Sequence, residues 1–290
     1  MKENVISFFI IIGVLGLVGA LWLAYENPAL NPRLQEETYK IIRKWDMPVE
    51  LEEISGIQYI QSEKMACVQD EEGAIFIFDL NTDLVDKKIN FGKTGDYEAI
   101  AIIDSTAYVL ESSGKLHVIK NYLYPTIDVE TIQTPFSGKN NMESMAADSI
   151  NDRLLLTVKD RDPNSKSFKG IYALDLETRK VSMNPIFKIP LDDPILKSKS
   201  GKDKESTNFY PSDIAVNPLD GNIYLLEGKN PRLLLMDKNG KLLQLHKLNR
   251  EFFPQPEGMT FSPEGILYIS NEGKDGMANI LEVELKKPKP

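Results

Sequence analysis

A unit built on a short alternating β-strand recurs five times, and this repeat restricts the possible folds more than any other feature. Its copies read ISGIQYI (54–60), YEAIAII (97–103), MESMAAD (142–148), PSDIAVN (211–217) and PEGMTFS (256–262). Equivalent positions lie 43, 45, 69 and 45 residues apart. Further apolar runs bounded by turn residues follow each copy, which indicates several short antiparallel strands per unit. A period of roughly 40–50 residues is typical of β-propeller blades.

The ends of the repeat region indicate how such a ring would close. The one long interval contains a polar stretch, residues 198–207, that reads as a loop insertion. Only 33 residues follow Glu257, too few for a complete blade, and residues 39–49 read as a lone strand before the first unit. We therefore predict an all-β, five-bladed β-propeller in which this N-terminal strand completes the last blade and leaves no open edge. A pair of β-sandwiches or an irregular all-β fold is the alternative.

An uncharged segment precedes the repeats. Residues 5–25 form a run of 21 residues without a charge, with Trp22 and Tyr25 at its end. A helix of this length would rise about 31 Å, enough to cross a bilayer core, and terminal aromatic rings favour the interface. We predict a single transmembrane helix; a cleaved signal peptide and a buried core helix are the alternatives.

The predicted organisation has four parts. Residues 1–4 are a short tail, 5–25 the membrane anchor, 26–37 a linker with two Asn-Pro pairs, and 38–290 the propeller ectodomain. Lys2 and the amino terminus favour an inside N-terminus, which places the propeller on the extracytoplasmic side of the membrane.

Composition excludes several classes of function. The net charge is −9, from 34 Lys and Arg against 43 Asp and Glu, and without a basic block the chain lacks the features of a nucleic-acid binder. A single cysteine excludes an internal disulfide, and two distant histidines, His117 and His246, exclude an HExxH metal site. No GxSxG motif is present, so serine-hydrolase chemistry is disfavoured.

Two sets of polar residues are predicted to meet at one mouth of the propeller channel. The first set stands at the start of each predicted inner strand and comprises Ser55, Glu98, Glu143, Ser212 and Glu257, with Asp213 beside Ser212. The second set stands at the end of each following strand and is wholly acidic: Asp70, Glu111, Asp160, Glu227 and Glu272. Because paired antiparallel strands bring these two ends to the same face, we expect both sets near one opening.

The predicted cluster of carboxylates needs protons or positive charge to balance its repulsion. Carboxylates that are buried together repel, so some pKa values rise or a cation enters. A hard cation such as Ca²⁺ binds six to eight oxygens, and we predict an axial Ca²⁺-type site on Glu98, Glu143 and Glu257, to which Asn141 and Asn271 could add oxygens. The alternative is structural: the glutamates accept backbone N–H hydrogen bonds from adjacent blades and fix their register. The remaining polar residues of both sets are then candidates for a ligand-binding rim.

Five motifs carry a resemblance to a known family. They are LEEISGI (51–57), DYEAIAI (96–102), NMESMAAD (141–148), YPSDIAVNPLDGNIYLLEG (210–228) and QPEGMTFSPEGILYISNEG (255–273). Over about residues 38–285 the chain resembles the SdiA-regulated domain family, which implies a membrane-anchored or exported bacterial envelope propeller. The second, third and fourth units have Glu-Ala, Glu-Ser and Ser-Asp where Glu-Gly is expected, and the fourth removes one carboxylate from the ring.

These observations lead to three functional hypotheses. The first is a non-enzymatic, membrane-anchored module that binds a small ligand or an envelope protein, with residues 186–209 as a candidate contact loop. The second is a Ca²⁺-dependent hydrolase of lactones or phosphoesters. The third is a scaffold in envelope assembly, since fold alone does not decide function.

Overall fold

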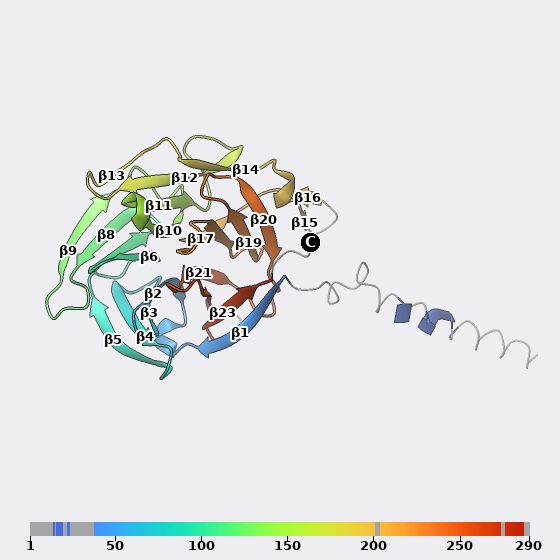
Figure 1. Ribbon diagram of the computed structural model, residues 1–290, viewed down its shortest axis with the longest axis horizontal. Coiled ribbons are helices and arrows are strands. Elements are labelled where there is room, and N and C mark those ends of the chain that lie inside the picture. Colours follow the sequence, from blue (N-terminus) through green and yellow to red (C-terminus); the bar gives the residue numbers. More distant parts are fainter. Residues whose placement is uncertain are drawn as a thin grey trace, which may run out of the picture. The chain divides into compact units, whose positions relative to one another are not determined.

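Five antiparallel sheets are arranged as blades around a common axis (Figure 1). The computed structural model describes residues 14, 16–19, 22–23, 38–200, 204–273 and 276–286, with only the backbone for 198–200 and 204–206. Tyr39–Lys287 forms one compact unit. The prediction of an all-β, five-bladed propeller is confirmed.

Strands within each blade follow one another from the axis outward, and only the last blade departs from chain order. Blade 1 is β2 (Ile54–Ile60), β3 (Lys64–Gln69), β4 (Ala74–Asp79) and β5 (Leu84–Asn90); blade 2 is β6 (Tyr97–Ile103), β7 (Thr106–Glu111), β8 (Lys115–Lys120) and β9 (Asp128–Gln133). Blade 3 is β10 (Met142–Asp148), β11 (Arg153–Val158), β12 (Phe168–Asp175), β13 (Lys180–Val181) and β14 (Phe187–Pro190). Blade 4 is β17 (Pro211–Val216), β18 (Ile223–Glu227), β19 (Arg232–Met236) and β20 (Leu242–Lys247). Blade 5 is β21 (Pro256–Phe261), β22 (Leu267–Asn271), β23 (Asn279–Leu285) and β1 (Tyr39–Asp46).

Burial decreases from the middle of a blade to its rim, and the sequence follows this gradient. Strand β18 reads IYLLE and is buried throughout, since its two faces pack against neighbouring blades. The outermost strand β9 reads DVETIQ and is largely exposed. Apolar clusters fill the space between neighbouring blades, so that burial of aliphatic and aromatic surface is the main force that holds the ring together.

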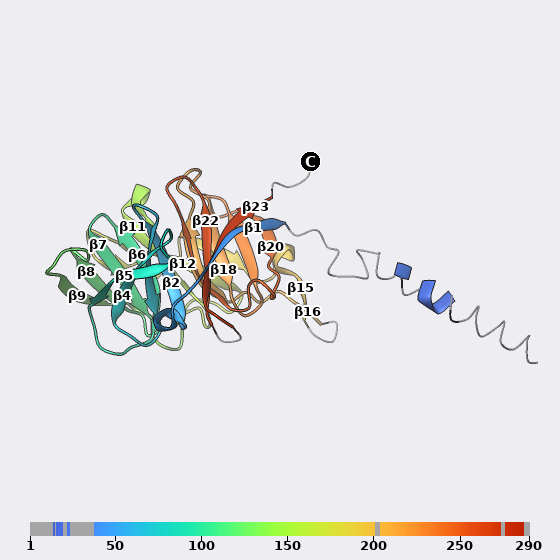
Figure 2. The same ribbon diagram turned by 90° about the horizontal axis from the view of Figure 1, so that it is seen from below.

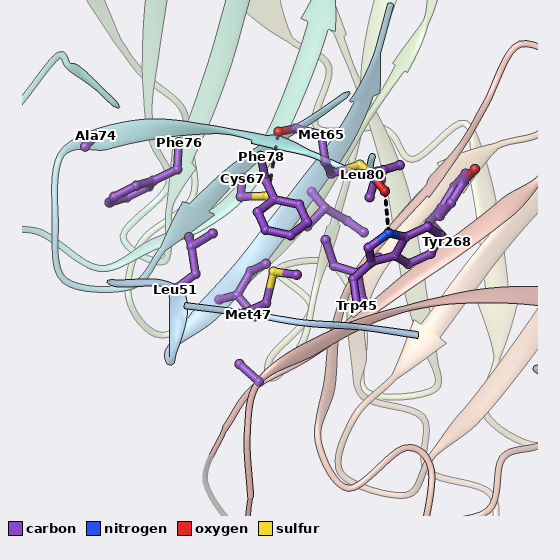
Figure 3. Close-up of a cluster of buried hydrophobic side chains, with 14 residues drawn as sticks. Trp45, Met47, Leu51, Met65, Cys67, Ala74, Phe76, Phe78, Leu80 and Tyr268 are labelled. Atoms are coloured by element: carbon purple, nitrogen blue, oxygen red, sulfur yellow. Dashed lines mark hydrogen bonds between the residues drawn. The ribbon is translucent and has the colours of Figure 1, made fainter. Parts of the chain in front are cut away.

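The N-terminal strand closes the ring, as predicted. Strand β1 pairs antiparallel with β23, from Tyr39 opposite Leu285 to Asp46 opposite Asn279. Figure 3 shows Trp45 of β1 packed between Tyr268 of blade 5 and the side chains of blade 1. The Trp45 indole N–H donates to the Leu80 carbonyl oxygen at 2.8 Å, which ties the last blade to the first.

The long interval between the third and fourth repeats is an insertion at the edge of blade 3. The outer strand of this blade is split, because β13 and β14 both pair with β12 at different heights. A 3-10 turn, η4 (Pro194–Leu196), and a hairpin of β15 (Ser198–Ser200) and β16 (Lys204–Ser206) follow before the chain enters β17. Two further 3-10 turns of the same length are η2 (Val49–Leu51) and η3 (Ser149–Asn151).

The ring has two faces. The axial mouth is the face at which the five inner strands begin, and the turn face is the opposite one, at which they turn into the second strands. Figure 2 shows the ring from the side, with its strands running between the two faces.

The predicted membrane anchor, residues 5–25, lies mostly outside the described residues. Those that are described there, 14, 16–19 and 22–23, are helical. Within the described parts of the chain, no helix combines the length and the apolar character needed to span a bilayer.

Replacement of Trp45 tests the closure. Trp45→Ala removes a side chain that is 2% exposed together with its hydrogen bond to Leu80, so we expect a loss of about 3–5 kcal/mol in the free energy of unfolding. Chemical denaturation of the variant measures this loss. Ile42→Ala, in the same strand but 45% exposed, is the matched control and should change stability by about 0.5 kcal/mol or less. Equal losses in both variants would contradict the closing role of Trp45.

Candidate functional site: a carboxyl cluster at the axial mouth

Each inner strand carries a β-bulge at its start. The register with the second strand shifts between Ile54 and Ile57, Tyr97 and Ala99, Met142 and Ser144, Pro211 and Asp213, and Pro256 and Gly258. The residues inside these shifts include the whole first set: Ser55, Glu98, Glu143, Ser212 and Glu257. A bulged residue leaves the regular ladder and its side chain is redirected, which is a common device at functional sites. The repeat thus encodes a repeated backbone distortion as well as a repeated side chain.

Three of the bulged residues influence one another electrostatically. Burial raises the pKa of Glu98 to about 9, with further contributions from the charges of Glu143, Asp96 and Glu257. Burial likewise raises the pKa of Glu143 to about 8; Glu257 adds to this rise and Lys159 opposes it. The structure therefore brings Glu98, Glu143 and Glu257, from three different blades, into one partly buried group.

A lysine supplies positive charge within this group. Lys159 directly follows β11, and its ammonium group forms an ion pair with Glu143 Oε2. Burial alone would lower the pKa of Lys159, but the charges of Glu257, Glu143 and Glu98 together raise it. Asn141 adds a hydrogen bond from Nδ2 to Glu143 Oε1 at 2.8 Å, so its amide donates to the cluster in this arrangement.

A second lysine holds the backbone that carries Lys159. The Lys169 ammonium group donates to the carbonyl oxygen of Lys159 at 2.5 Å and to that of Asp160. Lys169 is only 5% exposed, and burial lowers its pKa. Lys169 therefore acts on the cluster indirectly, by fixing the segment that places Lys159.

Blade 4 contributes structural links rather than a carboxylate of the cluster. Ser212 Oγ donates to the Pro256 carbonyl oxygen of blade 5 at 3.0 Å. Asp213 accepts from the backbone N–H of Ile214 at 2.8 Å and of Met259, in blade 5, at 2.6 Å. Burial raises the pKa of Asp213 well above its usual range. The structural alternative to a cation site was that the glutamates accept backbone hydrogen bonds from adjacent blades. In blade 4, Asp213 accepts such a bond.

Blade 1 approaches blade 5 through backbone rather than side chains. Ser55 is buried, and its carbonyl oxygen accepts from Ser270 Oγ at 3.1 Å. A Cβ on Gly258 would lie 2.3 Å from that same oxygen, so only glycine permits this approach. The two serine positions of the first set, Ser55 and Ser212, therefore serve the contact between blades.

The acidic second set does not form an equivalent ring. Glu111 and Glu227 are the last residues of β7 and β18, whereas Asp70 and Glu272 lie one residue, and Asp160 two residues, beyond their strands. The five acidic residues therefore stand at slightly different heights relative to their strands.

Two members of the second set have partners within their own blades. Burial alone would raise the pKa of Glu111, but hydrogen bonds from Lys115 and His117 at 2.6 and 2.7 Å outweigh it and lower that pKa. Glu227 is fully buried and accepts from Arg232 Nε at 2.8 Å.

Arg232 extends the role of Glu227 to the insertion. Its guanidinium group donates to the carbonyl oxygens of Leu196 and Asn208 at 2.9 and 2.6 Å. Because these residues stand on either side of the β15–β16 hairpin, the Glu227–Arg232 pair fixes both ends of the inserted segment. A buried ion pair is stabilising only when its other N–H groups also have acceptors, and the Arg232 guanidinium group finds them in these two carbonyl oxygens.

The other members of the second set differ in their surroundings. Burial raises the pKa of Asp70 to about 7, with contributions from Glu53 and Glu272, so these three carboxyl groups are neighbours. Glu272 accepts a hydrogen bond from Gln255 Nε2. Asp160 is exposed, and its charge contributes to the raised pKa of Glu143 in the cluster.

The groups gathered at the axial mouth include the carboxyl groups of Glu98, Glu143 and Glu257 and the ammonium group of Lys159, with further carboxylates, Asp96 and Asp160, close enough to act on them. Within the part of the chain that the structure describes, no group of three or more His, Cys, Asp or Glu has an arrangement suited to a metal ion. Asn271, predicted as an additional oxygen donor, is fully buried and uses its amide N–H groups on Phe252 and Asn279. The chemistry that this set supports is recognition of positive charge, or proton donation by a carboxyl group whose pKa is raised.

Sequence reasoning missed the two lysines. No lysine recurs at the positions of Lys159 and Lys169 in the other repeats, so a comparison of the repeats does not point to either residue. The available signal for Lys159 was the sequence VKD (158–160) at the end of a strand of the third unit, because the other units have no lysine at this point.

The raised pKa values predict a pH-dependent stability. Glu98 has an ordinary pKa of 4.5 in the unfolded chain and one of about 9 in the fold. Between these pH values the native state binds more protons, so the free energy of unfolding falls as pH rises. Glu98→Gln removes this difference and should flatten the decline by up to about 1.4 kcal/mol per pH unit. Urea denaturation across this window measures the slope.

A matched variant controls for general charge effects. Glu284→Gln changes an exposed glutamate of β23 and should keep the wild-type slope. A slope for Glu98→Gln equal to that of the wild type would show that Glu98 ionises normally in the fold.

Several solved propellers share this architecture. The crystal structure of Myxococcus xanthus glutaminyl cyclase is similar with a TM-score of 0.61 and 13% identity, covering 87% of this chain and 97% of that one. The PQQ-bound aldose sugar dehydrogenase of Streptomyces coelicolor gives 0.52 and 12%, over 86% and 98% of the two chains. A luciferin-regenerating enzyme gives 0.52 and 13%, over 83% and 95%. At these identities the likeness shows the fold alone.

The sequence itself gives a more specific result. A search of curated proteins found no match to the chain. The model of the SdiA-regulated family, in contrast, matches residues 33–274, which include all five inner strands and the whole carboxyl cluster. The chain therefore belongs to the SdiA-regulated family.

Proposed function

We propose that this chain is a binding module of the bacterial cell envelope whose axial mouth takes a cationic ligand in exchange for protons. The observation that carries the proposal is the convergence of Glu98, Glu143 and Glu257 around the Lys159 ammonium group. Carboxyl groups that share a partly buried site hold protons at neutral pH, and an incoming cation stabilises their ionised forms. Binding and proton release are therefore coupled at this site.

The internal lysine determines how a cation would be accommodated. Lys159 forms an ion pair with Glu143, and the charge of Glu257 also acts on it, so an incoming cation would meet Glu98 and Glu257, the more exposed carboxyl groups of the cluster, first. Both are partly exposed, whereas Glu143 is buried. Ca²⁺ would need further oxygens from water or backbone to reach six to eight ligands, while an organic ammonium group needs only two or three acceptors. The donor set thus suits an ammonium group better than a bare metal ion.

The anchor belongs to the same proposal. Residues 5–25 carry no charge, and Leu17 and Leu23, two of the residues described there, are 66% and 65% exposed. An uncharged apolar run of this length favours a lipid environment. We infer a single-pass tether that holds the propeller on the extracytoplasmic side of the bacterial cell membrane.

Calorimetric titration tests the binding function. Full-length protein in mild detergent is titrated at neutral pH with methylammonium and, separately, with Ca²⁺, in two buffers of different ionisation enthalpy. We expect saturable binding of methylammonium with release of about one proton per cation, since Glu98 and Glu143 hold protons before binding. Saturable binding of Ca²⁺ without binding of methylammonium would show that the site is a metal site and not one for an organic ammonium group.

Two variants link the binding to the cluster. Glu98→Gln should weaken binding by about tenfold or more and abolish the proton release, because its amide cannot ionise. Glu284→Gln, the exposed control, should bind as the wild type does. Failure of both cations to bind, or an unchanged affinity in Glu98→Gln, would contradict the proposal.

A second candidate function rests on the protonated state of Glu98. A carboxyl group with a pKa of about 9 keeps its proton at neutral pH and can act as a general acid, as hydrolysis of an ester or phosphoester requires. A panel of lactone, aryl ester and phosphoester substrates tests it. Under this reading turnover is measurable in the wild type and lost in Glu98→Gln; equal rates in the two proteins would exclude it.

A further inference from the structure

A second cavity opens on the turn face, away from the carboxyl cluster. It encloses about 830 Å³ between blades 1 and 2, within the range of small-molecule sites. Its lining extends from Pro263, in the inner turn of blade 5, to Leu123, in the outer hairpin turn of blade 2. Because these two residues belong to the inner and outer parts of the ring, the lining extends from the axis toward the rim.

The walls of this cavity are apolar on both sides. Blade 1 contributes Ile60 and Ile77, and blade 2 contributes Ile102 and Tyr122. Ile77 and Tyr122 belong to the buried cluster between the two blades, while Ile60 and Ile102 pack against it and stay partly exposed. Apolar surface is thus left open to solvent at a junction that is otherwise filled, and a ligand that covers it would gain roughly 25 cal/mol per Å² buried.

The rim is polar, and its charged lining residues have partners. Lys64 forms ion pairs with Asp86 and Asp79, and the Lys87 ammonium group donates to the Leu123 carbonyl oxygen at 2.7 Å, which links blade 1 to blade 2 across the cavity. Asp104 stands in the inner turn of blade 2. Two lysines thus face two aspartates around the opening, and either sign of ligand charge would meet both attraction and repulsion.

We propose that this cavity binds an uncharged amphiphile with a single alkyl chain. The apolar walls accept the chain, and the polar rim accepts a head group that exchanges hydrogen bonds without charge. A charged head group would give up hydration at a rim where charges of both signs lie close together, and Lys64 and Lys87 already have partners there. This site is independent of the axial mouth, because it uses no residue of the carboxyl cluster.

A matched ligand series tests the chemistry. Decanamide, decanoate and decylammonium share one chain and differ in head-group charge, and each is titrated into full-length protein held in a lipid nanodisc. The ligand that partitions into empty nanodiscs is measured separately and subtracted. We expect saturable binding of decanamide and affinities at least about tenfold weaker for both charged analogues. No saturable decanamide binding, or equal affinity for all three ligands, would overturn the proposal.

Two leucines of equal exposure provide the variant and its control. Leu123 at the rim and Leu243 in β20 of blade 4 are both 46% exposed, so replacement of either by aspartate should leave the fold intact. Leu123→Asp should weaken decanamide binding by about tenfold or more, because it adds a charge to the entrance, whereas Leu243→Asp should have no effect. Equal affinity in Leu123→Asp and the wild type would place the ligand elsewhere.

A further variant separates this site from the axial mouth. Glu98→Gln should bind decanamide as the wild type does, even though it is expected to lose cation binding. Loss of decanamide binding in Glu98→Gln would show that the amphiphile occupies the axial mouth, and would overturn the proposal of a second site.

Discussion

Closure of five sheets around one axis is the constraint on which the rest of the structure depends. Inner strands of neighbouring blades approach each other so closely that backbone lies against backbone, as Gly258 lies against the Ser55 carbonyl oxygen. A bulge at the start of every inner strand ends the regular ladder at that point. Strand β1 completes the arrangement, because its pairing with β23 removes the last open edge and sets Trp45 between the first and last blades.

The electrostatics of the axial mouth follow from this closure. Glutamates at the bulges of blades 2, 3 and 5 are brought together by the ring and cannot separate without opening it. Their repulsion is relieved in two ways, by the ammonium group of Lys159 and by protons held on Glu98 and Glu143. Blades 1 and 4 place no glutamate at the bulge, since Ser55 and Ser212 use these positions for contacts between blades. Blade 4 still reaches the cluster, because the charge of Glu257 acts on its buried Asp213.

Features that repeat were predictable from the sequence, and features that occur once were not. The five units, their period and the unmatched strand at residues 39–49 determined the blade number and the closure. The acidic residues after the second strands looked equivalent, yet Asp160 lies two residues beyond its strand while Glu227 lies within one. Lys159, Lys169 and the backbone bonds of Asp213 depend on tertiary contacts that no repeat signals. The ring was thus readable from periodicity, whereas the partners of its charges required the structure.

The central claim is that the glutamates at the axial mouth hold protons at neutral pH because the ring confines them together. The most direct measurement is the titration of the Glu98 side-chain carboxyl carbon by NMR, assigned by comparison with Glu98→Gln. The account predicts a midpoint of about 9. A midpoint near the ordinary value of 4.5 would contradict it.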